Sequence, residues 1–395
     1  MKILWVYGDF LHPTTRGGQI RTLETLKRLH SRHEIHYAGL WNPSHPEGPQ
    51  RATEYASHIY PVRHTVAEKT SPRFAVDIIK GLFAPTPVAV FRHQSHKMRA
   101  TVDHLRSDIS FDAVVCDFLS SAPHFSDLSG VVLFQHNVEA VIWQRHAGNA
   151  ATPLHRYYFG MQARRMVEYE RTVCKRVKSV IAVSDQDAQT MRDLYGVTRV
   201  GVVPTGVDVE FFTPSQESPP TTDLAFIGSM DWMPNVDGVL WFADEVLPRI
   251  RQKLPQSSVA VVGRKPAPEI TRLAERDPLI RITGTVEDVR PWLWGSKIAV
   301  VPLRIGGGTR LKIYEAMAAR TPVVSTTIGA EGLGVSHGEN ILIADSPEAL
   351  AESCIHLLRD ADERRRLSAA AFEHVRTRHS WDTAADAFER LLGAP

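Results

Sequence analysis

Short apolar runs alternate with amphipathic stretches along most of this chain. In its first half the expected strands lie at 2–8, 34–40, 111–118, 130–136, 179–185 and 199–208. Helical patterns lie between several of them, the clearest at 16–33 and 153–178. Because the strands lack polar alternation, the pattern is typical of a parallel sheet covered by helices on both faces.

The same alternation begins again after residue 223. Further strands are expected at 224–230, 257–263, 280–286, 297–303 and 321–326, separated by helical patterns and followed by two more. Residues 211–223 carry three prolines among Ser, Thr and Gln and favour a linker. The pattern predicts α/β architecture in two doubly wound domains, 1–210 and 224–379, with ligands bound in a cleft between them.

Composition agrees with a globular enzyme. The 395 residues exceed what one core normally covers, and 43% hydrophobic with 23% charged residues is ordinary for such a protein. No apolar run approaches the ~20 residues needed to cross a bilayer, and the first ten residues read as a strand rather than a signal peptide. Three widely spaced cysteines favour a reducing cytoplasm, with neither a disulfide framework nor a zinc site.

The net charge of +2 is unevenly distributed. Lysine and arginine outnumber the acids in residues 1–213 and are outnumbered in the rest. A basic half fits contact with an anionic partner such as a membrane surface, but it also fits a solvated surface. Likewise, Tyr157, Tyr158 and Phe159, which precede a run of cations, fit either a membrane-surface helix or a core helix with a charged outer face.

The stretch RIGGGTRLKIYEAMAARTPVVST, residues 304–326, suggests an anion site. Its glycines Gly306, Gly307 and Gly308 fall between a strand and a helix that begins near Thr309 or Arg310. Glycines allow the backbone to approach a ligand, and the free N–H groups of the helix start favour phosphate.

Two cations sit where a helix prefers acids. Arg310 and Lys312 oppose the helix dipole, and such a local conflict is typical of a functional site; the alternative is a surface turn with two solvated cations. Glu315 follows among apolar neighbours that predict a mostly buried helix. Its carboxylate then needs hydroxyl donors, such as those of a ribose, or an ion pair with Lys312.

At this point the chain resembles the family 4 retaining glycosyltransferases, which have the two-domain GT-B fold. GGGTRLKIYEAMAARTPVVST is similar to their donor-binding signature, and RGGQIRTLETLKRL, FQHNVE, SVIAVSDQDAQTM, VVPTGVDVEFF and FIGSMDWMPNVDGVLWF are similar to other segments in the same order. The resemblance implies transfer of a sugar from a UDP- or GDP-linked donor to a glycan, lipid-linked or small-molecule acceptor. It also implies that a last helix, about 380–395, packs back on the N-terminal domain.

The resemblance also implies roles for particular residues. Glu315 would contact the donor ribose, Arg310 and Lys312 the diphosphate, and His136 the region of the donor sugar. These four residues are the expected catalytic residues. Asn137 and Glu139 are candidates on the acceptor side. The remaining donor-site candidates are the glycine-loop residues Gly306, Gly307, Gly308 and Thr309, and Gly17, Gly18, Gly228, Gly263, Gly284 and Val286.

Three positions depart from the family pattern. Gly307 stands where the family has the first glutamate of its signature, and Ser229 and Asn235 stand in the region where many relatives have arginine and lysine. Arg310 and Lys312 are therefore expected to neutralise the diphosphate. Arg320 stands where the family commonly has glycine, so we expect it to adopt a left-handed conformation at the helix end.

The expected activity is that of a cytoplasmic, metal-independent hexosyltransferase, peripheral at the membrane if the basic half contacts lipid. No cofactor or metal is required, and no nucleic acid partner is expected. The chain lacks the glycine fingerprint of NAD-dependent dehydrogenases and the lysine step of P-loop NTPases. A sugar-nucleotide 2-epimerase of the same fold and a non-catalytic sugar-nucleotide-binding subunit remain as alternatives.

Overall fold

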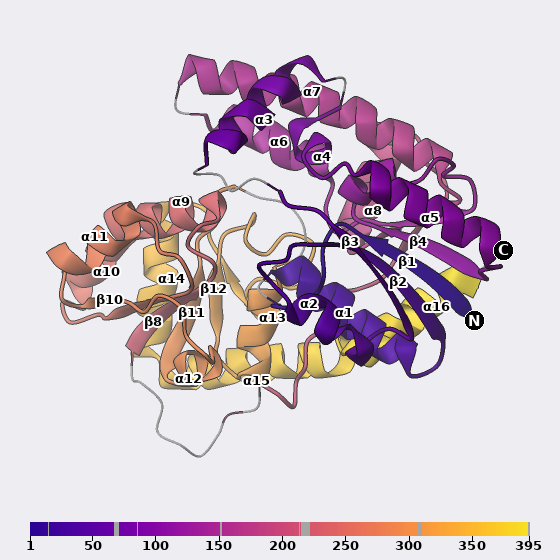
Figure 1. Ribbon diagram of the computed structural model, residues 1–395. Helices are drawn as coiled ribbons and strands as arrows, with labels where there is room; N and C mark the ends of the chain where they lie inside the picture. The colour runs from indigo at the N-terminus through magenta and orange to yellow at the C-terminus, as the bar shows by residue number, and fades with distance from the viewer. Residues whose placement is uncertain are drawn as a thin grey trace. The chain divides into compact units, whose positions relative to one another are not determined.

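A computed structural model describes residues 1–14, 16–66, 71–84, 86–150, 152–212, 214, 222–305 and 310–393. The chain divides into two compact units, and each contains one parallel sheet covered by helices (Figure 1). The first unit is Met1–Thr205 with Trp381–Pro395, and the second is Gly206–Ser380. The prediction of two doubly wound α/β units is confirmed.

The sheet of the first unit has the order β3-β2-β1-β4-β5-β6-β7, with every described pair of strands parallel. Its strands are β1 (Lys2–Tyr7), β2 (Glu34–Trp41), β3 (His58–Arg63), β4 (Ala113–Asp117), β5 (Val131–Phe134), β6 (Ser179–Ala182) and β7 (Val200–Val202). Its helices are α1 (Gly17–His30), α2 (Glu47–Gln50), α3 (Pro72–Phe83), α4 (Val88–Phe91), α5 (His96–Asp108), α6 (Glu139–Gly148), α7 (Pro153–Arg176), α8 (Asp185–Tyr195) and α16 (Trp381–Gly393).

Strand β1 shows why these strands lack polar alternation. Leu4 and Val6 belong to the hydrophobic core that includes residues of α5, α7 and α8. The intervening Trp5 faces the other way and packs against Phe388 of α16, with ring centroids 5.2 Å apart. Both faces of the strand are therefore buried, as expected for a central parallel strand.

Helix α16 packs against α1, although more than 350 residues separate them in the sequence (Figure 1). Arg28 of α1 donates to Asp382 at 2.8 Å, and Arg32 pairs with Asp386 and Glu389 at 2.7 Å each. Because these pairs are partly exposed, each contributes little, and burial of the apolar face of α16, which includes Phe388, contributes more.

Strand β3 was not expected from the sequence. Apolar and polar residues do not alternate regularly in it, and it includes Pro61, which pairs in register with Gly39 of β2. Proline cannot donate a ladder hydrogen bond, so it is tolerated because β3 is the edge of this sheet.

The sheet of the second unit has the order β10-β9-β8-β11-β12-β13. Its strands are β8 (Thr222–Ile227), β9 (Val259–Val262), β10 (Ile280–Ile282), β11 (Ser296–Val301), β12 (Val323–Ser325) and β13 (Leu342–Ile343). Its helices are α9 (Met233–Trp241), a π-helical segment Phe242–Val246, α10 (Leu247–Lys253), α11 (Pro268–Arg276), α12 (Arg290–Trp294), α13 (Leu311–Ala318), α14 (Pro347–Arg359) and α15 (Ala361–Arg378).

The linker expected at 211–223 lies mostly outside the described residues. Of those described, the main-chain oxygens of Phe211 and Phe212 accept hydrogen bonds from Arg290 and Trp294, at 3.0 and 2.9 Å. Thr222 already belongs to β8. Both ends of this stretch therefore belong to the second unit.

Arg320 ends the turn after α13 with a φ of 58°, so the expected left-handed conformation is confirmed. Two contacts offset the cost of this conformation. Ser368 of α15 donates to the Arg320 carbonyl at 2.6 Å, and the Arg320 guanidinium lies 3.7 Å from the centroid of the Phe372 ring.

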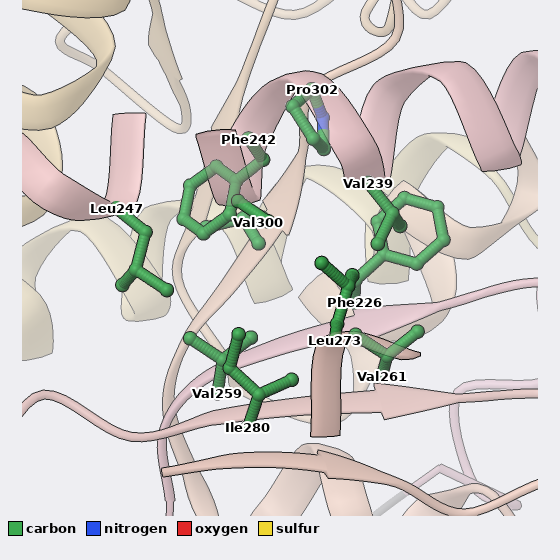
Figure 2. Close-up of a pocket in the computed structure, with 11 residues that line it drawn as sticks. Phe226, Val239, Phe242, Leu247, Val259, Val261, Leu273, Ile280, Val300 and Pro302 are labelled. Atoms are coloured by element: carbon green, nitrogen blue, oxygen red, sulfur yellow. The ribbon is translucent and has the colours of Figure 1, made fainter. Parts of the chain in front are cut away.

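A small apolar cavity of about 10 Å³ lies in the core of the second unit (Figure 2). It is lined by apolar side chains of the sheet, of α9, of α11 and of the π-helical segment, among them Phe226, Phe242 and Leu273. A space of this size and polarity is a packing gap rather than a ligand site.

Among the described residues, no helix combines the length and the apolar character needed to span a membrane.

Candidate functional site

Each sheet contains one point where the direction of strand addition reverses. In the second unit it lies between β8 and β11, which are paired in parallel, and in the first between β1 and β4. The segments that leave two such strands diverge, so ligands of doubly wound sheets bind at the carboxyl ends there. The residues predicted from the sequence can therefore be placed against these two points.

At the β8–β11 point the side chains of α9 and α13 meet. Lys312 Nζ donates to Asn235 Oδ1 at 2.9 Å and lies 4.4 Å from the centroid of the Phe226 ring. Asn235 is held in turn because its Nδ2 donates to the Ser229 carbonyl at 2.8 Å. A Cβ on Gly228 would lie 2.6 Å from Lys312 Nζ and 2.7 Å from Asn235 Nδ2, so a larger residue there would displace this pair.

The charged groups of α13 have shifted acidities. Burial lowers the pKa of Lys312 to about 7, and the nearby Arg310 lowers it further while Glu315 opposes. Burial also raises the pKa of Glu315 to about 7, against the effect of Lys312. Arg310 is only 5% exposed, and its guanidinium lies 5.8 Å from the centroid of the Trp232 ring. Two cations are thus held in a partly desolvated place, where they would favour an anion.

The predicted glycines of this edge differ in what they do. A Cβ on Gly263 would lie 1.8 Å from the Gly228 carbonyl oxygen, so the ends of β8 and β9 pack backbone on backbone. Gly284 has a φ of 68° with open space around it, and Val286 packs beside the cluster of Ala260, Val262 and Trp292. Gly306, Gly307, Gly308 and Thr309 lie outside the described residues.

At the β1–β4 point of the first unit, Gly18 contacts an aromatic stack. Phe118, which follows β4, stacks on the rings of His136 and Tyr7, with ring centroids 3.8 Å and 5.3 Å apart. A Cβ on Gly18 would lie 2.4 Å from Phe118 Cζ. The need for glycine at 18 therefore comes from this ring, whereas Gly17 is exposed at the start of α1.

His136 is buried, and both of its ring nitrogens have partners. Nε2 lies 2.7 Å from Asp117 Oδ1, and Nδ1 lies 2.9 Å from Nη1 of Arg21. Because the carboxylate only accepts and the guanidinium only donates, the ring is neutral, with its proton on Nε2. Burial lowers the pKa of His136 to about 4, although Asp117 opposes this. With both nitrogens engaged, the ring is held in one orientation and one tautomer.

Asp117 is the centre of this network. It is fully buried, and its Oδ2 accepts hydrogen bonds from Trp5 Nε1 at 2.9 Å and Thr22 Oγ1 at 2.7 Å. Arg21, which contacts the other side of His136, also donates to Thr205 Oγ1. The network therefore ties β1, α1 and the ends of β4 and β5 into one arrangement.

The two acceptor-side candidates lie next to each other at the start of α6. Asn137 Nδ2 is 3.3 Å from Glu139 Oε1. Burial and the neighbouring Glu170 raise the pKa of Glu139 to about 7. Glu170 is fully buried and accepts hydrogen bonds from Gln135 and Tyr195, both at 2.6 Å, and from two main-chain N–H groups at the start of α6.

Sequence reasoning missed Asp117, Phe118, Arg21 and Glu170. For Asp117 and Phe118 a signal existed, since an acid and an aromatic residue directly follow an apolar strand at the edge where ligands bind. Arg21 and Glu170 are in the interiors of α1 and α7. A charged residue inside an amphipathic helix is normally expected on its solvent-exposed face, so the local sequence gives no sign that these two are buried.

Comparison with known protein families gives two matches. Residues 15–211 match the model described as Glycosyltransferase Family 4, and residues 221–360 match the model described as Glycosyl transferases group 1. A 44.6 kDa protein in the cps region of Klebsiella pneumoniae is 20% identical over 387 residues, 95% of each chain. The D-inositol 3-phosphate glycosyltransferase of Xylanimonas cellulosilytica is 27% identical, but that match spans only 55% of this chain and 57% of the relative.

Solved structures with similar folds cover nearly the whole chain. Sucrose-phosphate synthase of Thermosynechococcus elongatus has a TM-score of 0.75 at 16% identity, covering 99% of this chain and 98% of that one. HepE of Anabaena, solved with UDP and glucose, has a TM-score of 0.69 at 15% identity and 99% coverage of both. WaaG, a glycosyltransferase involved in lipopolysaccharide biosynthesis, scores 0.68 at 16% identity, with 100% of both chains covered. The chain shares the fold of these proteins.

The contact between Gly18 and Phe118 predicts a stability difference between two glycine substitutions. Gly18→Ala should lower the free energy of unfolding by about 1–3 kcal/mol, because Phe118 is stacked on both faces and cannot move aside. Gly160→Ala, inside α7 where an added Cβ would have nothing within 4 Å, should raise it by about 0.5–1 kcal/mol. Urea unfolding followed by circular dichroism measures both. Equal stability of the two variants would contradict the packing described.

Proposed function

Since the chain is a glycosyltransferase of the GT-B fold, with a family 4 domain followed by a group 1 domain, we propose that it transfers a hexose from a nucleoside diphosphate sugar to an acceptor hydroxyl. The donor is UDP- or GDP-linked, the anomeric configuration is retained, and no metal is needed. The UDP and glucose held by HepE support a nucleotide sugar as donor. Relatives that act on an inositol phosphate or in lipopolysaccharide biosynthesis support a polysaccharide or glycolipid product.

One observation carries the proposal for the donor site: the Lys312 ammonium meets Asn235 at the β8–β11 point. Asn235 stands in the region where many relatives of the resembled family have lysine. Its contact with Lys312 means that a cation reaches this place from α13 instead of α9. Negative charge grows on the leaving diphosphate as the sugar bond breaks, so a cation fixed there stabilises the transition state more than the ground state.

Glu315 completes the proposed donor site. The residue is only partly exposed, and burial raises the pKa of its carboxyl group to about 7, so the site disfavours an unpaired carboxylate. Two adjacent ribose hydroxyls would supply the donors that this group needs. In the first unit, Asn137 and Glu139 are the proposed acceptor contacts, and His136 is proposed to position the transferred sugar.

Moving the cation from position 312 to position 235 tests the donor site. Lys312→Met should weaken binding of UDP or GDP about 10- to 150-fold, the equivalent of ~1.5–3 kcal/mol for one charge-assisted hydrogen bond, and should lower turnover further. Adding Asn235→Lys to this variant should restore part of both losses, because the two side chains meet at one place. Calorimetry and turnover assays measure these effects.

The matched control is Lys297→Met. Lys297 is exposed and pairs with Asp223 at 2.8 Å, at the opposite end of β11. This variant should bind and turn over like the wild type. If Lys312→Met also does so, the donor site lies elsewhere.

Three further experiments test the reaction itself. Nucleotide release only in the presence of acceptor separates a transferase from an epimerase. NMR of the product reports the anomeric configuration, and the release assay repeated in EDTA tests the need for a metal.

The pKa of Lys312 predicts a pH dependence of nucleotide binding. In the ligand-free protein the Lys312 ammonium group loses its proton near pH 7. A bound diphosphate stabilises the charged form, so binding above pH 7 takes up a proton. Affinity should therefore fall as the pH rises from 7 to 9, by up to about tenfold per pH unit. The measurement uses a Glu315→Gln background, because Glu315 titrates in the same range. Lys312→Arg in that background should flatten the profile, and a flat profile with Lys312 present would contradict the prediction.

Peripheral contact with an anionic membrane is part of the proposal. Val76 and Ile79 of α3 are 47% and 57% exposed, and Leu154 and Tyr157 of α7 are 75% and 69% exposed. Each pair has a spacing of three residues and so lies on one helix face. Arg165 of α7 donates to the Gly81 carbonyl of α3, so the two helices lie together (Figure 1).

Vesicle sedimentation tests this contact. The protein should sediment with anionic vesicles at low salt and be released by high salt, because surface charge attraction is screened. Ile79→Glu with Leu154→Glu should reduce sedimentation, whereas Gln189→Glu on the exposed face of α8 should not. Equal recovery on neutral and anionic vesicles at low salt would contradict membrane contact through charge.

A further inference from the structure

Two histidines and a glutamate meet at the start of β2 and β3. His36 pairs in register with His58 on the neighbouring parallel strand. Side chains alternate between faces along a strand, so Glu34 and His36 of β2 and His58 and Tyr60 of β3 point to one side of the sheet. Among the described residues, Glu34, His36 and His58 form a group whose ligand atoms all lie within 4.8 Å of one another.

The separations within this group approach those of a metal site. Glu34 Oε1 lies 2.9 Å from His36 Nε2 and 3.3 Å from His58 Nε2. Zinc binds imidazole nitrogen and carboxylate oxygen at about 2.0–2.2 Å, so the ligand atoms of a tetrahedral site lie roughly 3.3 Å apart. Two separations are therefore near this value before any rearrangement. We propose that Glu34, His36 and His58 bind one divalent zinc ion, with water as the fourth ligand.

Tyr60 supplies the outer support that such a site requires. Its hydroxyl group lies 2.9 Å from His36 Nδ1, which leaves Nε2 directed at Glu34. The ring of Phe111 packs edge-on against His36 with centroids 5.1 Å apart. Metal-binding histidines commonly have their second nitrogen held in this way, which fixes the ring and its tautomer.

Exposure and charge around the group are compatible with metal entry. His36 is buried, whereas the side chains of His58 and Glu34 are 52% and 41% exposed, so one side is open to solvent. Lys2 Nζ lies 3.7 Å from Glu34 Oε1 and is the cation that a metal would displace. Its side chain is 38% exposed, so it can move into water without losing a buried contact.

The position of the group indicates a structural metal. Glu34 and His58 are the first residues of their strands, at the end of the sheet opposite the carboxyl ends where ligands bind. Strand β3 is the sheet edge and carries Pro61. A zinc ion shared between β2 and β3 would hold this edge strand in register.

Metal titration of the tag-free full-length chain tests the proposal. One equivalent of Zn²⁺ should bind and raise the thermal unfolding midpoint, because the site forms only in the folded sheet. Co²⁺ should give the visible absorption bands of a tetrahedral site. His58→Ala should remove both effects, and Tyr60→Phe should weaken zinc binding about 10- to 100-fold.

His104→Ala is the matched control. His104 is 75% exposed on α5 and pairs with Asp108 at 3.2 Å, and within the described part of the chain this exposed pair has no third ligand. Its variant should bind Zn²⁺ and Co²⁺ like the wild type. The proposal is overturned if the wild type gives no saturable Co²⁺ bands, or if His58→Ala binds one equivalent of Zn²⁺ with unchanged affinity. Circular dichroism of the variants at 20 °C verifies that they are folded.

Discussion

The parallel pairing of β8 with β11 is the constraint on which the second unit depends. Parallel strands bring their carboxyl ends to one edge, and at this pair the following segments turn in opposite directions. Asn235 and Lys312 can meet only because of this geometry. The glycines at the ends of β8 and β9 then let backbone and ammonium group occupy a space that side chains would fill. The cationic site is thus a consequence of strand order, and it also needs the small residues at the ends of β8 and β9.

Burial of the cation is unfavourable for the free protein. The lowered pKa of Lys312 shows that the site disfavours its charged form, and Arg310 beside it adds repulsion. A bound anion would offset both effects, so stability given up in the free protein would appear as affinity for the ligand. Strain in the first unit is compensated differently. Phe118 has a φ of 64°, which is costly for a phenylalanine, and its contacts with Tyr7 and His136 hold it there.

In the first unit, the buried Asp117 determines how the neighbouring side chains are arranged. A fully buried carboxylate must be satisfied, and here Trp5, Thr22 and His136 provide its partners. The consequence is that the histidine of the FQHNVE segment is fixed in orientation and protonation. The ring of His136 is therefore a rigid, neutral element of a buried network.

The sequence by itself determined what depends on local rules. Apolar runs without polar alternation predicted two doubly wound α/β units, because strands that are buried on both faces of a parallel sheet have apolar residues at consecutive positions. At AARTP, where the resembled family commonly has glycine, the sequence predicted the left-handed Arg320. Only the tertiary structure decided which distant residues meet. Asn235 and Lys312, Asp117 and His136, and His36 and His58 come together through strand order and register. Those depend on packing across the whole sheet, and no periodicity within one segment records them.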